Sequence, residues 1–479
     1  MGLIVCPRKV LTRSANRGTL TCDLRCPRLE HGGQVTSLTW GWRQSMDIGT
    51  GLAIAGLLAG VAAVYFAVAP QRLVKKLRSI DRFLQGRRHL KREIGHLFAR
   101  SLIEQEHFCS DTEIPLLTKE RWIPSGPLPL DSISLRLRSI SATEQVAEAK
   151  RKVRHYLPRR DSGGRVDTYS EAVGLFDQPE IWFDSCSYRL LEVNAGRTEG
   201  RMGGEGIQLT FGLARYFDGQ DTSEFLAYEA ADRDARTKRR VTEGGYRNWL
   251  ADPFDLGRRS ALPGISALTL RCSSQEAFFF MLRRDGEKVA YAMNATGVVP
   301  AGEFQPHNDI LPVWLTDLDL WRTVMREYAE ELLGYQESMG RGGAIIDYEN
   351  DEPYRQFSKA RRSGDVTVRF LGLGIDSLSW KPLICLVCIW KDSAFDRIFK
   401  GMTEVNQEGI VVVGEHARRG FRGIRFNASN VLGYAGDSVT EPPARACLTL
   451  AWRWRHLLQI PGVELQRQLP GPYFASRRD

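Results

Sequence analysis

The sequence predicts an α/β protein, an α/β/α sandwich with a mixed sheet, preceded by an accessory α+β domain and one N-terminal transmembrane helix. Three observations lead to this prediction. Residues 48–69 carry no charge, short apolar runs alternate with Gly-rich breaks from residue 131 onward, and a helical pattern near the middle of the chain places three glutamates on one side. With 479 residues, 43% of them hydrophobic and 26% charged, the chain is long enough for two folded domains.

The positive charge is concentrated at the front of the chain. The whole sequence has a formal net charge of +9, to which residues 1–45 contribute +5 and residues 46–100 contribute +7, which leaves −3 for the rest. A protein that binds nucleic acid usually spreads basic residues over its folded surface. DNA and RNA are therefore not among the expected partners.

The N-terminal part divides into two segments. Residues 1–45 show no sustained helical or strand period, so we expect them to be disordered, unless the native start is Met46. Residues 46–70 are predicted to form a transmembrane helix, because 22 uncharged residues span a bilayer core and exceed the apolar region of a signal peptide. Asp47 precedes this run and basic residues follow it, which places the following domains in the cytoplasm. Gly56 and Gly60 form a GxxxG pair that could pack two such helices into a homodimer.

Residues 71–130 are interpreted as a basic amphipathic stem followed by a Pro-rich linker. Leu73, Leu77, Ile80 and Leu84 recur at spacings of three and four, which is typical of a helix with one apolar side. Two alternatives stay open for the stem: it lies along the anionic inner leaflet, or it forms a short coiled coil. Four prolines between residues 115 and 129 mark the linker. Residues 131–260 follow as the accessory α+β domain, in which no catalytic constellation stands out.

Residues 261–479 contain the elements of the sandwich. Apolar runs at 265–270, 277–282, 366–375 and 383–390 are predicted strands, and Asp285-Gly286 is typical of a hairpin turn. Cys385 and Cys388 form a CxxC pair, but residues three apart on a strand face opposite sides, so we expect two buried thiols rather than a metal site. A tryptophan-rich helix over residues 444–458 should pack on the sheet.

The helical pattern over residues 317–335 carries the candidate chemistry. Glu327, Glu330 and Glu331 stand three and four residues apart, so a helix brings their carboxylates to one side. Like charges at this spacing repel, and a hard divalent cation would turn that repulsion into attraction. Arg326 fits a residue that orients a carboxylate or binds a phosphate in a bidentate manner.

This pattern resembles a known motif. The string REYAEELLG, from Arg326 to Gly334, resembles the second half of the Nudix box, R-E-x-x-E-E-x-G, which is the metal-binding helix of hydrolases that cut nucleoside diphosphates linked to another group. Residues 298–303 are similar to the segment that opens the box, so the resemblance implies that Gly302 and Glu303 bind the ligand. Residues 261–479 are therefore expected to form a Nudix-like α/β/α sandwich.

The sequence also departs from the motif. Gly302 and Arg326 are 24 residues apart, which is more than in the family, so either residues 307–316 form an insertion or the first half of the box has degenerated. Leu318 stands where the family has a further glutamate.

The resemblance implies a set of functional residues. Arg326, Glu327, Glu330, Glu331 and Glu408 would be catalytic, and the three glutamates of the helix would hold Mg²⁺ or Mn²⁺. The metal would neutralise the pyrophosphate and activate a water.

The domain order resembles a second group of proteins. One transmembrane helix, a basic stem and a Nudix-like domain are similar to the membrane-bound TM-Nudix effectors of bacterial anti-phage systems, which respond to a cyclic oligonucleotide. This likeness implies a single-pass protein of the inner membrane with a nucleotide or cyclic oligonucleotide ligand. Two functions stay open: a nucleotide sensor or effector, which the missing glutamate favours, and an active metal-dependent hydrolase of a nucleoside diphosphate-linked substrate.

Overall fold

The computed structural model describes residues 48–138, 144–160, 164–179, 182–197, 205–237, 239–284, 295–335, 345–402, 409–412 and 423–463. The chain divides into the units Met1–Tyr65 and Phe66–Asp479, and the second is described below. Helix α1 (Ile48–Glu104) begins in the first unit, but its side chains before residue 71 are outside the described set, including the positions of Gly56 and Gly60. The predictions for residues 1–45, for the Asp285-Gly286 turn and for Glu408 also fall outside the described residues. Within the described part of the chain, no helix is both long and apolar enough to cross a membrane.

A mixed seven-stranded sheet forms the centre of the second unit. Its strand order is β1 (Leu128–Pro129), β10 (Val366–Ile375), β11 (Pro382–Lys391), β5 (Gly264–Cys272), β6 (Ala277–Phe279) and β13 (Ile424–Arg425), and β9 (Ala301–Glu303) also pairs with β5. Strands β11 and β5 are parallel, whereas the other pairs are antiparallel. The predicted α/β class, the mixed sheet and the strands β5, β10 and β11 are therefore confirmed.

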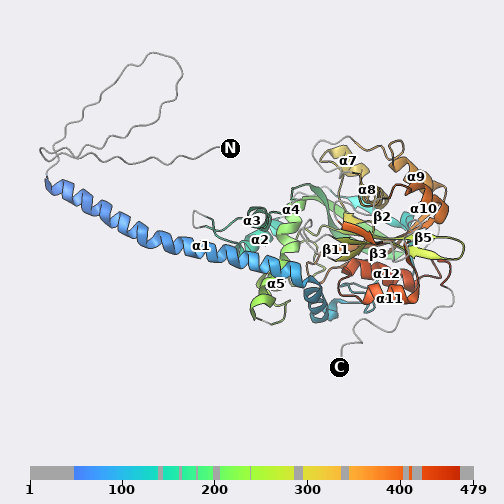
Figure 1. Ribbon diagram of the computed structural model, residues 1–479, viewed down its shortest axis with the longest axis horizontal. Coiled ribbons are helices and arrows are strands. Elements are labelled where there is room, and N and C mark those ends of the chain that lie inside the picture. Colours follow the sequence, from blue (N-terminus) through green and yellow to red (C-terminus); the bar gives the residue numbers. More distant parts are fainter. Residues whose placement is uncertain are drawn as a thin grey trace, which may run out of the picture. The chain divides into compact units, whose positions relative to one another are not determined.

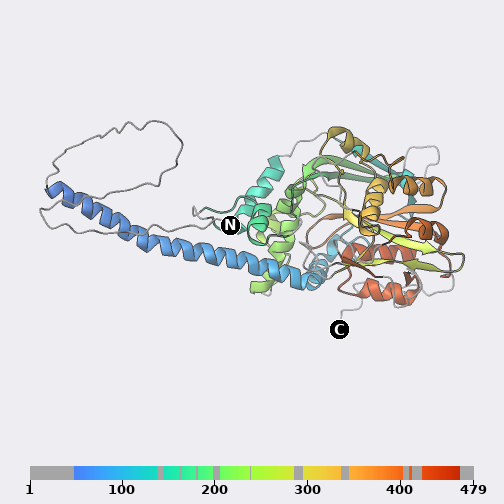
Figure 2. The same cartoon turned by 45° about the horizontal axis from the view of Figure 1, so that its top comes forward.

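Helices cover both faces of this sheet (Figure 1 and Figure 2). Helices α8 (Leu320–Glu331), α9 (Tyr354–Arg362) and α10 (Asp392–Ile398) lie on one face, and α11 (Ala428–Gly436) and α12 (Pro442–Arg453) lie on the other. Side chains of β11 alternate between the two resulting cores: Cys388 belongs to the α8 side, and Cys385 belongs to the α12 side. Both thiols are buried, as the alternation along a strand predicted.

The region before the sandwich shares one of these cores. Its three-stranded sheet has the order β2 (Ile133–Leu137), β4 (Glu205–Arg215), β3 (Cys186–Arg197), and its helices include α2 (Glu144–Val153), α3 (Tyr169–Phe176), α5 (Phe225–Thr237) and α6 (Gly245–Leu250). Tyr188 and Phe211 of this sheet contact Phe304, which directly follows β9. One continuous hydrophobic core therefore joins residues 131–260 to the α8 side of the central sheet.

A small sheet, two short helices and several 3-10 turns complete the described elements. Strands β7 (Met281–Arg284), β8 (Thr296–Val298) and β12 (Gly409–Val412) form a small separate sheet. Helix α4 (Tyr216–Gly219) continues through a π-helical turn (Gln220–Glu224) into α5, and α7 (Leu311–Thr316) precedes α8. Short 3-10 turns occur at Glu106–Phe108, Leu130–Ser132 and Arg154–Tyr156.

The stem is part of the folded unit from Phe83 onward, an arrangement that neither sequence alternative included. Phe83, Leu90 and Leu97 are buried in the shared core, and the buried Arg87 donates to Asp177 and to the Tyr169 hydroxyl. Because α1 is amphipathic along this whole stretch, its pattern could not distinguish a partner helix or a membrane from the protein's own core.

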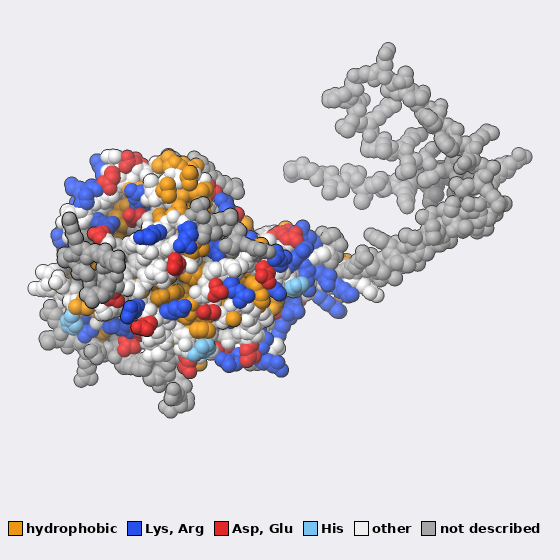
Figure 3. Space-filling view, turned by 180° about the vertical axis from the view of Figure 1, so that it is seen from behind, with side chains coloured by type: hydrophobic (Ala, Val, Ile, Leu, Met, Phe, Trp, Pro, Cys, Tyr) orange, Lys and Arg blue, Asp and Glu red, His pale blue; other side chains and the backbone are white. Residues whose placement is uncertain are grey.

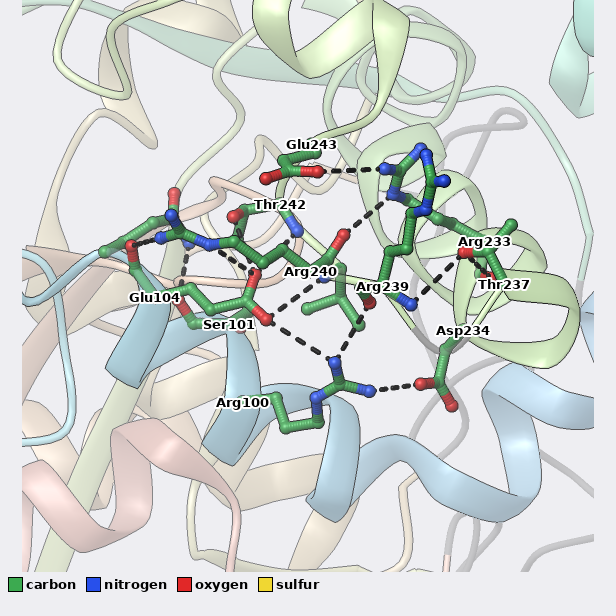
Figure 4. Close-up of polar contacts among 12 residues, drawn as sticks. Arg100, Ser101, Glu104, Arg233, Asp234, Thr237, Arg239, Arg240, Thr242 and Glu243 are labelled. Carbon is green, nitrogen blue, oxygen red and sulfur yellow. Dashed lines mark hydrogen bonds and ion pairs between the residues drawn. The ribbon is translucent and has the colours of Figure 1, made fainter. Parts of the chain in front are cut away.

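Two further contacts hold the segment around the stem in place. At the end of α1, the Glu104 carboxylate accepts hydrogen bonds from the backbone N–H groups of Val241 and Thr242 and from the Thr242 hydroxyl, and Arg100 pairs with Asp234 (Figure 4). In the Pro-rich linker, the Leu117 N–H donates to the Ile375 carbonyl, and strand β1 pairs with β10. The linker therefore extends the central sheet.

Candidate functional site

Helix α8 forms where the sequence pattern predicts it. Asp319 caps its N-terminus by accepting a hydrogen bond from the Arg322 N–H, and Gly334, with φ of +70°, follows its C-terminal end in the left-handed region that glycine adopts readily. Between these signals, apolar side chains such as Val324 and Tyr328 are buried against the sheet. The register that buries them directs Glu327 and Glu331 toward β9.

Glu327 and Glu331 both reach β9. A Cβ atom at Gly302 would overlap the Glu327 carboxylate, so this carboxylate lies against the strand only because residue 302 is glycine. The buried Glu331 accepts a hydrogen bond through Oε2 from the Ala301 N–H at 3.1 Å. The structure therefore brings together Gly302, Glu327 and Glu331.

Glu330 has a different neighbour. It is half-buried and lies near Tyr354 of α9, whose pKa is raised to about 12 by burial first and by the Glu330 charge second. Among the residues with described side chains, no group of three His, Cys, Asp or Glu side chains is arranged to hold a metal ion. Mg²⁺ or Mn²⁺ binding by Glu327, Glu330 and Glu331 therefore stays a prediction.

Arg326 belongs to a buried polar cluster with Asp317, Tyr348 and His307. Its Nη1 donates to Asp317 Oδ2 at 3.1 Å and to the Tyr348 hydroxyl at 2.6 Å, and its Nη2 donates to the Gln305 carbonyl at 2.5 Å. Burial alone would raise the pKa of Asp317, but hydrogen bonds from His307 and the charge of Arg326 outweigh it and hold that pKa below its ordinary value. Arg326 therefore orients a carboxylate, which is one of the two roles expected for it.

The same cluster fixes the segment between Gly302 and Arg326. His307 approaches Asp317 Oδ2 through its backbone N–H at 2.9 Å and through Nδ1 at 2.6 Å, and its Nε2 accepts from the Ile346 N–H at 3.2 Å. Both ring nitrogens are thus engaged, so His307 has a structural role. The residues between Gly302 and Arg326 include α7, and Asp317 links this segment to Arg326 of α8.

Glu303 belongs to a second charged group that sequence reasoning missed. Its Oε2 accepts from Lys381 Nζ at 2.6 Å, and Glu224 Oε1 lies 3.9 Å from the same nitrogen. Burial raises the pKa of Glu224 to about 7, against the opposing effect of Lys381. Glu303 Oε1 and Glu224 Oε2 are buried with no hydrogen-bond partner in the described part of the chain. Glu224 ends the π-helical turn, and a π-helix often marks a functional position, but no residue pattern signals one in advance.

Comparison with known proteins adds no family assignment. No protein-family model matches the chain, and no curated protein is similar to it in sequence.

Proposed function

We propose that this chain is a membrane-anchored, Nudix-like nucleotide-recognising protein that acts as a sensor or effector in a bacterial nucleotide-signalled anti-phage system. The contact between Gly302 and Glu327 is the observation that carries the proposal. It brings the glycine of the opening segment against the glutamate helix, although Gly302 and Arg326 are 24 residues apart in the sequence. The arrangement of α8 and α12 on opposite faces of a mixed sheet supports the same conclusion.

The protein contacts of this site favour recognition over hydrolysis. One oxygen of Glu331 is bonded to the Ala301 N–H, and Arg326 is bonded to Asp317 and Tyr348. Groups held in this way keep the strand and helix in register.

The membrane anchor in this proposal rests on the sequence. Residues 48–69 form an uncharged run, and basic residues follow it directly. A ligand that forms in the cytoplasm would then meet its receptor at the inner membrane.

Binding and turnover by the full-length protein in lipid nanodiscs test the proposal. With Mg²⁺ present, cyclic oligonucleotides and nucleoside diphosphate derivatives should include at least one ligand that binds saturably and is recovered intact. Hydrolysis that Glu330→Gln and Glu331→Gln both abolish would show an active hydrolase instead. Absence of binding by every nucleotide tested would overturn both functions.

A further inference from the structure

Basic side chains of α1 and of a neighbouring segment lie together just before α1 enters the folded core. We name this group the basic collar: Lys75, Lys76, Arg78 and Arg82 of α1, with Arg159 and Arg165 of the segment that follows α2. The Arg159 N–H donates to the Ser79 hydroxyl at 3.0 Å, and Arg159 and Arg165 form an antiparallel β-bridge. Two parts of the chain that are distant in sequence are therefore fixed together as one positively charged surface.

The arginines of the collar are close enough to repel one another. The pKa of Arg165 is lowered by burial and then by the charges of Arg159 and Arg82. Arg82 forms an ion pair with Asp232 at 3.0 Å, but the same carboxylate also pairs with Arg236. One carboxylate thus serves two guanidinium groups.

Exposed apolar side chains lie in the same turns of α1. Leu73 is 54% exposed and Leu77 is 55% exposed, and Val74 between them is also exposed. The stripe that they begin continues through Ile80 to the buried Phe83, so the same side of the helix is covered by protein farther along. Figure 3 shows Lys and Arg side chains gathered over these turns of α1. Basic and apolar side chains together on a helix are typical of a segment that lies in a membrane interface.

We propose that the basic collar, together with Leu73, Val74 and Leu77, is a docking surface for the headgroups of anionic phospholipids. The basic groups would lie at the phosphates, and the three apolar side chains would enter the boundary between headgroups and acyl chains. The surface directly follows the uncharged residues 48–69, which place it at the depth of the headgroups if they span the bilayer. The inference rests on the proposed function only in requiring that the chain reaches a membrane.

Partitioning of the full-length chain onto vesicles tests this proposal. The chain is synthesised without cells in the presence of vesicles of phosphatidylcholine alone, or of phosphatidylcholine with phosphatidylglycerol, and bound protein is measured by flotation. We expect several-fold more binding to the anionic vesicles, and loss of this excess in high salt, because surface charges are screened. Each basic residue near an anionic surface contributes about fivefold in partitioning.

Charge-reversed variants locate the effect. Lys75→Glu with Arg78→Glu changes two exposed side chains and should remove the preference for anionic vesicles. Arg159→Glu with Arg165→Glu should weaken it through a different segment. The matched control is Arg355→Glu with Arg362→Glu on α9, which makes the same change in net charge at side chains that are each 60% exposed, and it should keep the preference.

The outcomes separate this inference from the proposed function. Equal binding to both kinds of vesicle, or an equal loss in the α9 control, would overturn the docking surface. Nucleic acid that binds the collar and displaces the vesicles would also overturn it. Nucleotide binding is measured on the same variants and should not change, because Gly302 and Glu327 lie on other elements. If the wild type binds no nucleotide but still prefers anionic vesicles, the proposed function is refuted and the docking surface is not.

Discussion

Replacement of Arg326 by methionine should reduce the free energy of unfolding by about 3–5 kcal/mol, because it removes one partner of a buried ion pair and leaves the other buried. The side chain of Arg326 is 6% exposed and that of Asp317 is not exposed at all. The change also leaves the Gln305 carbonyl and the Tyr348 hydroxyl without their guanidinium donor. Methionine keeps most of the volume, so a cavity adds little to the loss.

Urea unfolding of the full-length protein, followed by tryptophan fluorescence, measures this effect. Because the urea slope grows with protein size, a loss of this size lowers the unfolding midpoint by about 1 M or less. Arg322→Met on the same helix is the matched control: its side chain is more exposed, its Nη1 donates to the Thr316 carbonyl at 2.6 Å, and its guanidinium lies 4.8 Å from the centre of the Tyr348 ring. It should cost about 1 kcal/mol.

The dependence on pH gives an independent check. The folded pKa of Asp317 is held below its ordinary value, so its contribution to stability is present above about pH 4 and is lost as pH falls through the folded pKa. The difference between wild type and Arg326→Met should shrink in the same range. An unchanged midpoint at pH 7, with nucleotide binding abolished, would show that Arg326 contacts the ligand and would refute this reasoning.

Three further predictions concern other contacts. Gly302→Ala should displace the Glu327 carboxylate and weaken nucleotide binding at least tenfold in calorimetry. Tm should change little, because only the end of a flexible side chain must move. In a Glu327→Ala background, Gly302→Ala should have no additional effect on binding. Because the pKa of Glu224 is raised in the folded protein, the free energy of unfolding of the wild type should fall by up to about 3 kcal/mol between about pH 4.5 and 7. Glu224→Gln should remove this fall, as measured by urea unfolding at each pH. Glu104→Ala should cost about 1–3 kcal/mol in the same assay by removing the acceptor for Val241 and Thr242, whereas the exposed Glu106→Ala should cost less than about 0.5 kcal/mol.

The sequence predicted those parts of the fold that depend on local patterns. The spacing of apolar residues and the length of each run were enough to predict β5, β10, β11 and the glutamate helix. The alternation of side chains along a strand was enough to predict that Cys385 and Cys388 are buried. Other predictions were imprecise at the boundaries. The helix that Pro442 was expected to open does begin there, but it ends at Arg453 rather than at Leu458. The run at 277–282 is divided between β6 and β7.

The remaining features depend on partners that are distant in sequence. Nothing in the neighbourhood of Arg326 indicates that Tyr348 and Asp317 surround it, and nothing near Glu303 indicates Lys381. The stem shows the same limit, since an apolar stripe indicates that a surface is covered but not what covers it. The sequence therefore indicated the glutamate helix and the opening glycine separately, but neither the contact between Gly302 and Glu327 nor the roles of the individual side chains.

Photoaffinity labelling tests most directly whether a nucleotide binds between β9 and α8. A cyclic oligonucleotide that carries a photoreactive base is bound to the full-length protein in nanodiscs, crosslinked, and located by peptide mass spectrometry. We expect adducts on residues 296–303 and 320–335, competed by unlabelled ligand and lost in Gly302→Ala. Competed adducts confined to residues 144–237 would contradict the proposed site.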